Sequence, residues 1–141
     1  MKFFLLVIVI ILFISSCSSD KKDTTNFNIS SETKLYNAGL KKLKQKRFEE
    51  AIENFTELEI QYPYSEWSAR GQMLTGFAHY SAKEYDEAVL SLSKFIELNP
   101  DHPLVPYAIF LKAYSYYERT PNINLDQQYS IKSLEQFLEL T

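Results

Sequence analysis

The chain divides into three stretches that differ in polarity. Residues 3 to 14 are all apolar, residues 18 to 31 are almost all polar, and residues 32 to 141 mix apolar and charged positions. Lys2 before the apolar run and the small residues Ser15 and Ser16 after it form the pattern of a secretory signal peptide. As a helix the apolar run would measure roughly 18 Å, against about 30 Å for a hydrocarbon core. We therefore predict that residues 1–16 are a signal peptide and not a permanent membrane span.

The third stretch repeats itself with a period of 37 residues. Self-similarity at such a period is typical of a solenoid of helical hairpins. Three small residues recur in this frame: Gly39, Gly76 and Ala113. Five further pairs match between the first two units: Phe48 with Tyr85, Ala51 with Ala88, Phe55 with Leu92, Leu58 with Phe95, and Pro63 with Pro100. The pattern predicts an all-α solenoid of about two and a half to three repeats, at residues 32–68, 69–105 and 106–141.

Each unit is expected to form two helices that end at a proline. The small residues Gly39 and Gly76 let two helix backbones approach closely, and Phe55 and Leu92 are expected to fill the space between neighbouring hairpins. Proline ends each unit, as at Pro63, because it lacks the amide donor and clashes with the preceding turn.

The third unit departs from this frame. Three of its residues match the second unit at a spacing of 45: Ser133 with Ala88, Phe137 with Leu92, and Leu140 with Phe95. Eight extra residues are therefore expected between its two helices. Residues 119–125 are the predicted place, because Pro121 and two asparagines there favour a loop.

The polar stretch before the repeats is predicted to be a flexible tether, over residues 17–31. Its sequence offers too little apolar surface to be buried in a core. Fully extended, residues 18–31 reach at most about 45 Å. Such a tether would let the repeat domain work at a membrane surface or slightly away from it.

Composition argues against several classes of function. The formal net charge is -3 and the basic residues form no long run, so nucleic acid is not an expected partner. Cys17 is the only cysteine, which excludes disulfides and cysteine-zinc sites. No sequence pattern supplies a nucleophile together with its base. We predict that the protein is not an enzyme and carries no metal or cofactor.

The histidines and the paired carboxylates have ordinary structural explanations. His79 is expected in the middle of a helix, packed or facing solvent, and His102 in a turn between two prolines. The pairs Glu49-Glu50 and Asp86-Glu87 open second helices, where carboxylates are favoured by the helix dipole. We interpret these pairs as helix-start charges and not as a catalytic pair.

Three positions on the predicted first helices are apolar in every unit. In a repeat of this type the first helices line the concave surface, so these positions predict a groove for an extended apolar peptide. The nine residues are Tyr36, Met73 and Phe110, then Leu40, Phe77 and Tyr114, then Leu43, Tyr80 and Tyr117. Only Arg70 is placed to grip a terminal carboxylate, so no carboxylate clamp is expected. The alternative is that the stripe is core, covered by the next hairpin.

The run Ile14-Ser15-Ser16-Cys17 resembles the bacterial lipobox. The resemblance implies that the Cys17 thiol is joined to diacylglycerol, that the signal is cut just before it, and that the new amine is acylated. Two or more acyl chains hold a protein stably on a bilayer. Ser18 at the next position implies export to the outer membrane, with the domain facing the periplasm. The alternative is a chance thiol beside an ordinary cleavage site.

The repeat resembles the tetratricopeptide repeat, lengthened by three residues around positions 62–67. A narrower resemblance is to the BamD family, the lipoprotein of the outer-membrane β-barrel assembly machine. Four segments carry it: Leu35-Tyr36-Asn37-Ala38, Gln61-Tyr62-Pro63-Tyr64-Ser65, Phe95-Ile96-Glu97-Leu98-Asn99-Pro100-Asp101-His102-Pro103 and Tyr107-Ala108-Ile109-Phe110. The resemblance implies a scaffold and receptor whose early repeats receive the C-terminal strands of unfolded outer-membrane proteins. Its implied partners are BamA, the barrel insertase, and the machine's other subunits.

The chain stops inside its third unit, whereas members of that family carry five repeats, with BamA docking largely on the later ones. Phe137, Leu138 and Leu140 fall in its last five residues, with no polar helix after them. A solenoid normally needs a polar terminal repeat for solubility. We therefore expect this chain to be part of a longer natural protein.

Two other functions stay open at this point. The first is a tetratricopeptide lipoprotein that serves as a scaffold for cell-wall synthesis or cell division. The second is a lipid-anchored hydrolase of cell-wall material, which would need a paired acid and base in a cleft. The sequence shows no such pair, so the binding functions are favoured.

Overall fold

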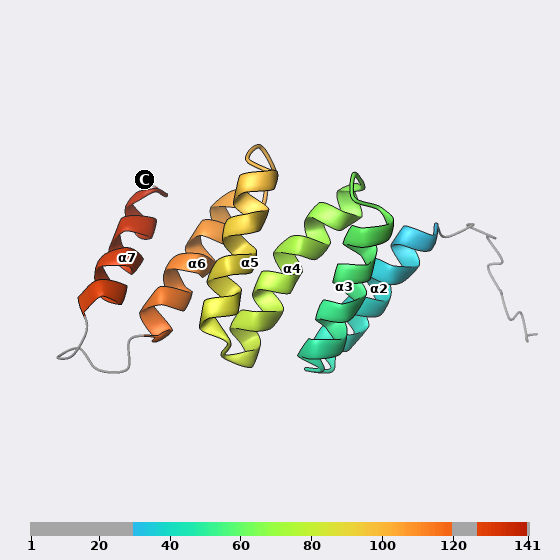
Figure 1. Cartoon of the computed structure of the whole chain (residues 1–141), viewed down its shortest axis with the longest axis horizontal. Helices are drawn as coiled ribbons and strands as arrows, with labels where there is room; N and C mark the ends of the chain where they lie inside the picture. The colour runs from blue at the N-terminus through green and yellow to red at the C-terminus, as the bar shows by residue number, and fades with distance from the viewer. Residues whose placement is uncertain (1–29, 120–126, 141) are drawn as a thin grey trace, which may run out of the picture.

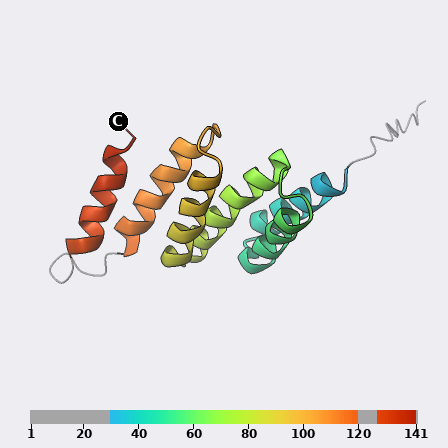
Figure 2. The same cartoon turned by 45° about the horizontal axis from the view of Figure 1, so that its top comes forward.

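The computed structural model describes residues 30–119 and 127–140, and all regular structure in these ranges is helical. Six helices follow one another as an elongated array, from α2 beside the N-terminal end to α7 at the other (Figures 1 and 2). Their bounds are α2 Ser31–Lys44, α3 Phe48–Gln61, α4 Glu66–Ala82, α5 Tyr85–Leu98, α6 Val105–Arg119 and α7 Gln127–Leu138. Each helix packs on the next, which confirms the predicted all-α solenoid of tetratricopeptide-like hairpins.

Local sequence signals explain where these helices begin. Ser30 caps α2, its Oγ accepting a hydrogen bond from the Thr33 amide at 3.4 Å, and Ser65 caps α4 by accepting from the Trp67 amide at 3.2 Å. The acidic pairs predicted at helix starts lie in the first turns of α3 and α5. Because Ser65 starts α4 at Glu66, the predicted boundary between residues 68 and 69 is wrong and falls inside this helix.

Close helix approach occurs where the repeat predicted it. A methyl group added at Gly39 would lie 2.5 Å from the Phe55 ring, and one at Gly76 would lie 2.6 Å from Leu92 Cγ. Phe55 also meets α4 near Gly71, so this ring fills the space between neighbouring hairpins. The glycines are therefore needed for interhelical contact, since each sits where a larger residue would displace a buried side chain.

The array is tighter on the side of the first helices. The backbones of α2 and α4 approach each other closely, and so do those of α4 and α6, whereas α3 and α5 lie farther apart and are bridged by the side-chain ion pair of Lys94 and Glu59. A row of helices whose alternate members lie closer together on one side curves toward that side. The first helices α2, α4 and α6 therefore line the inner surface of the described array.

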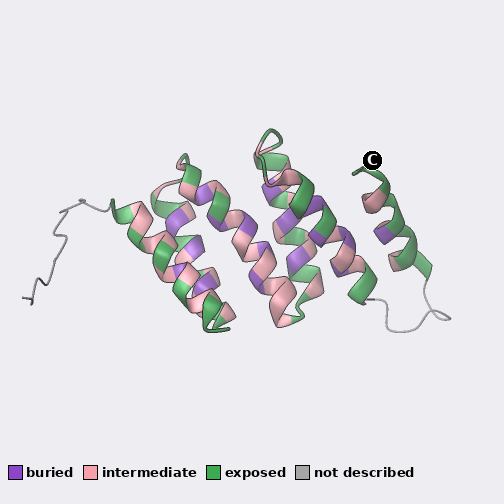
Figure 3. Cartoon of the chain, turned by 180° about the vertical axis from the view of Figure 1, so that it is seen from behind, coloured by how far each residue is buried: buried purple, intermediate pink, exposed green. Residues whose placement is uncertain are grey.

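The third hairpin is the least covered part of the array. Ser133 is buried in α7 and its Oγ donates to the Ala113 carbonyl at 3.0 Å, as its alignment with Ala88 led us to expect. Phe137 is only half-buried and Leu140 is exposed, although their counterparts Leu92 and Phe95 are buried. No described helix packs on the outer face of α7, which Figure 3 shows as largely exposed. The insertion predicted within 119–125 lies almost wholly outside the described residues.

Candidate binding surfaces

The inner side of the array carries a row of aromatic rings, which we term the inner aromatic surface. It consists of Tyr80 from α4 and Tyr107, Phe110, Tyr114 and Tyr117 from α6. The ring centroids of Tyr80 and Tyr114 lie 6.0 Å apart and link the two helices. Within α6, the Tyr114 ring lies 5.9 Å from that of Phe110 and 5.7 Å from that of Tyr117, and Phe110 lies 6.3 Å from Tyr107. These spacings are within the range of interacting aromatic pairs.

Helix geometry explains why these rings form one row. Residues three or four apart lie on the same face of a helix, and the four aromatic residues of α6 follow this spacing. Tyr107, Phe110 and Tyr117 remain exposed, while Ala108 and Leu111 on another face are buried against α5. The row is thus an accessible apolar surface beside a separate packing face.

Tyr80 brings a polar group to this surface. Burial raises the pKa of its phenol above the ordinary value, and the nearby Glu118 carboxylate adds to the shift. The phenol therefore stays protonated at neutral pH and can donate a hydrogen bond to a carbonyl of a bound chain.

Four of the nine predicted groove residues lie in the inner aromatic surface: Tyr80, Phe110, Tyr114 and Tyr117. Leu40 and Leu43, on α2, are half-buried, and Phe77 is half-buried against the core. The Tyr36 ring is also half-buried, with its centroid 4.7 Å from that of Trp67. The described structure therefore brings together part of the predicted stripe, three residues on α6 and Tyr80 on α4.

Met73 does not belong to this surface, and its predicted place in the groove is wrong. Its side chain is only 3% exposed and packs in a core cluster with Leu92, Phe95 and Leu111. Phe110, at the equivalent position one repeat later, is 43% exposed. The difference arises because α5 and α6 enclose Met73, whereas Phe110 is covered only in part, by the Phe137 ring of α7 at 6.0 Å between centroids. This position is therefore core where a further hairpin follows, and it stays accessible at the end of the described array.

Two aromatic residues of the inner side were missed by the sequence reasoning. Tyr107 lies three residues before Phe110, and that helical spacing could have identified it. Trp67 packs on Tyr36 and lies 5.5 Å below the Arg70 guanidinium, a cation-π contact. Trp67 could have been placed in the first turn of α4 from its position two residues after Ser65, which caps that helix.

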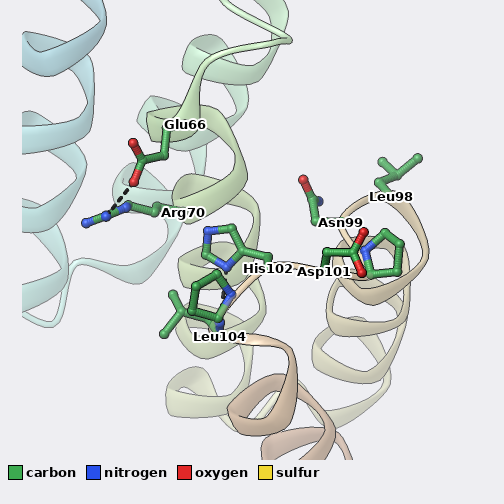
Figure 4. Close-up of a pocket in the computed structure, with 9 residues that line it drawn as sticks. Glu66, Arg70, Leu98, Asn99, Asp101, His102 and Leu104 are labelled. Atoms are coloured by element: carbon green, nitrogen blue, oxygen red, sulfur yellow. Dashed lines mark hydrogen bonds and ion pairs between the residues drawn. The ribbon is translucent and has the colours of Figure 1, made fainter.

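A second candidate surface lies where the α3–α4 and α5–α6 turns come together. A pocket of about 620 Å³ there is lined by residues of α4 and of the segment 98–104 (Figure 4). A neighbouring pocket of about 600 Å³ shares Glu66, Leu98 and Asn99 with it and extends to Pro63 and Tyr64. We refer to the two pockets together as the edge trough. Prolines and leucines supply much of its wall.

Polar side chains of the edge trough are held by internal contacts. Arg70 pairs with Glu66 at 2.6 Å, as Figure 4 shows. His102 lies in the turn where the sequence placed it, and its Nδ1 accepts from the Leu104 amide at 3.1 Å. The Asn99 amide donates to Gln72 Oε1 at 2.9 Å. These bonds fix the shape of the trough, and Arg70 is the cation that a bound carboxylate would meet.

The described residues contain neither a metal-binding cluster nor a membrane-spanning helix. Within residues 30–119 and 127–140, no group of three or more histidine, cysteine, aspartate or glutamate side chains could hold a metal ion. No helix of this part of the chain has the length and apolar character needed to cross a bilayer.

Comparison with known proteins assigns the family. A family model named YfiO and described as an outer membrane lipoprotein matches residues 29–141. The chain belongs to this family. The predicted resemblance to the BamD family is confirmed by relatives called outer membrane protein assembly factor BamD.

Three of these BamD relatives show how far the similarity extends. The protein from Caulobacter vibrioides is 38% identical over 115 residues, which is 81% of this chain and 38% of the relative. The protein from Rickettsia prowazekii is 32% identical over 124 residues, 88% of this chain and 49% of the relative. The protein from Neisseria gonorrhoeae is 29% identical over 115 residues, which is 79% of this chain and 43% of the relative. The chain thus spans less than half the length of these relatives.

Proposed function

We propose that this chain is a non-enzymatic scaffold and receptor in the assembly of outer-membrane β-barrel proteins. Its relatives are called outer membrane protein assembly factor BamD, and this similarity supports the assignment. In this proposal residues 1–16 are a signal peptide, residues 17–31 a tether, and residues 32–141 the repeat domain. Cys17 carries the N-acyl and S-diacylglycerol lipid that holds the domain on the periplasmic face of the outer membrane, and no other cofactor is needed.

The inner aromatic surface is the observation that carries the proposal. Five aromatic rings in mutual contact offer a broad apolar face, and tyrosine hydroxyls at its rim can stay hydrated while the rings are covered. An unfolded β-barrel segment presents apolar side chains on one side and open backbone donors and acceptors. Ring stacking can bind the side chains, and the Tyr80 hydroxyl can bind a backbone carbonyl.

The partners of this proposal follow from the same surfaces and from the family. Unfolded outer-membrane protein C-terminal segments, which alternate apolar residues and end in an aromatic, are the proposed ligands of the aromatic surface. BamA and other subunits of the assembly machine are the proposed protein partners.

A peptide-binding assay tests the aromatic surface. We expect the double variant Phe110→Ser/Tyr117→Ser to bind a labelled C-terminal β-strand peptide about tenfold or more weakly than the parent chain, because two exposed apolar contacts are lost. Fluorescence anisotropy measures the affinity and circular dichroism checks that the helices persist. Leu90→Ser is the control, since Leu90 is an even more exposed apolar residue but lies on α5. Equal weakening by both variants would contradict a role for the aromatic surface.

A further inference from the structure

The described domain has two edges formed by the ends of its helices. One edge contains Ser30, where the preceding chain joins α2, together with the turns at residues 62–65 and 99–104. We call it the tether edge. The opposite edge contains the turns at residues 45–47 and 83–84. Figure 1 shows the α2 start and both tether-edge turns along one side of the array.

Large apolar side chains are exposed at the tether edge. Tyr64 is fully exposed at the tip of the α3–α4 turn, and Leu98 is 57% exposed at the end of α5. Ile60 is exposed in the last turn of α3. Tyr64 and Leu98 come from different hairpins but line the same pocket of the edge trough. This edge therefore presents a continuous apolar margin.

The turns of the opposite edge have a different character. Every side chain in these turns ends in a charged or an amide group. The residues are Gln45, Lys46, Arg47, Lys83 and Glu84. Lys46 and Lys83 adopt left-handed backbone conformations, with φ of 60° and 65°, that suit a sharp exposed turn. Solvation of polar side chains explains why the residues of this edge are exposed. It does not explain the exposure of Tyr64 and Leu98 at the tether edge.

Charges at the tether edge are partly neutralised within the domain. Glu59 pairs with Lys94 at 2.6 Å and Glu66 pairs with Arg70 at 2.6 Å. Glu97 and Asp101 are further carboxylates near the α5–α6 turn. The edge is therefore not a basic patch that would seek anionic phosphates, and its attraction to a surface must come from apolar contact.

The geometry points to a lipid surface as the occupant of the tether edge. We infer that this edge rests on the headgroup layer of the membrane, with Tyr64 and Leu98 inserted among the headgroups. A chain that leaves the domain at this edge and is anchored at Cys17, at most about 45 Å away, holds the same edge nearest the bilayer. Tyrosine suits that depth, because its ring is buried while its hydroxyl meets water and headgroups. The inference goes beyond the proposed function and rests on it only for the anchor.

Site-specific fluorophores test the contact in the lipidated chain. Acylated Cys17 leaves no thiol, so a cysteine introduced by Tyr64→Cys, Leu98→Cys or Lys83→Cys can be labelled alone with an environment-sensitive dye such as NBD. The lipidated protein is reconstituted on phosphatidylcholine vesicles and on vesicles that contain phosphatidylglycerol. We expect a blue-shifted emission, quenched by nitroxide-labelled lipids, at positions 64 and 98 and not at position 83. We also expect the response on phosphatidylcholine to be at least as strong as on phosphatidylglycerol.

Three results would overturn the inference. They are an equal response at all three positions, no response at position 64, or a response at position 64 that requires an added peptide or BamA in place of lipid. If the dye labels Cys17 in the parent chain, that thiol is free and the lipid anchor is missing. This control separates a missing anchor from a failure of the edge to contact lipid. As a second variant, Tyr64→Ser/Leu98→Ser should lower vesicle binding of the unlipidated Cys17→Ala chain about tenfold. It should leave peptide binding to the inner aromatic surface unchanged.

Discussion

A Cys17→Ala variant is expected to lose its hold on the outer membrane completely, either as an uncleaved precursor or as a chain released into the periplasm. Removal of the thiol removes the proposed attachment point of the diacylglycerol. Among the described residues no helix is long and apolar enough to replace it. Two acyl chains are needed for stable anchoring, and protein contacts at the tether edge alone would give only reversible binding.

Membrane fractionation and mass spectrometry of the mature N-terminus measure this outcome. Ser16→Ala is the matched control, because it keeps a small residue before the cysteine and keeps the thiol. The control should fractionate with the outer membrane and carry the lipid mass. Normal fractionation of Cys17→Ala would refute the lipid anchor.

Phe95→Ala is expected to destabilise the repeat domain by about 3–5 kcal/mol. Phe95 is fully buried, packs with Met73 and Leu92, and touches the His102 ring edge-on at 5.3 Å between centroids. It thereby joins α4, α5 and the α5–α6 turn. Removal of the ring leaves a cavity at the point where two hairpins meet, and a domain of this size has a total stability of about 5–15 kcal/mol.

Urea denaturation followed by circular dichroism measures the loss. Phe110→Ala is the matched control, since it removes the same ring from a side chain that is 43% exposed. We expect the control to cost about 1 kcal/mol or less. Similar losses for the two variants would mean that the second and third hairpins do not pack as described.

The sequence predicted the helices because their determinants are local and recur. The positions of Gly39 and Gly76 identified where helices approach, and Phe55 and Leu92 fill those places in the structure. Repetition strengthened each inference, since a chance pattern does not return at the same spacing. Helix starts were less accurate, because the Ser65 cap, which sets the start of α4, was not considered.

Burial of the stripe positions was harder to predict because it depends on neighbours. Met73 and Phe110 occupy the same place in the repeat, yet one is core and the other is exposed. The sequence of one repeat unit does not show whether a neighbouring unit covers its side chains. The same limit applies to Phe137 and Leu140, which are less buried than their counterparts Leu92 and Phe95 in the second unit.

The edge trough was missed for a different reason. Its walls come from residues near positions 63–72 and 98–104, which a repeat pattern treats as equivalent turns and not as neighbours. Arg70 was noted in the sequence as an isolated cation. The structure places it near His102 and across the pocket from Leu98, where its charge borders an apolar wall.

Photo-crosslinking in living cells tests the central claim, that the inner aromatic surface receives unfolded outer-membrane proteins. A photoreactive residue is placed at Tyr117 or Tyr114, with Leu90 on α5 as the control position, and the adducts are identified by mass spectrometry. We predict precursors of β-barrel proteins among the adducts from α6 and their absence from the control. Adducts with cell-wall or division proteins alone, or equal adducts from all three positions, would contradict the proposed role.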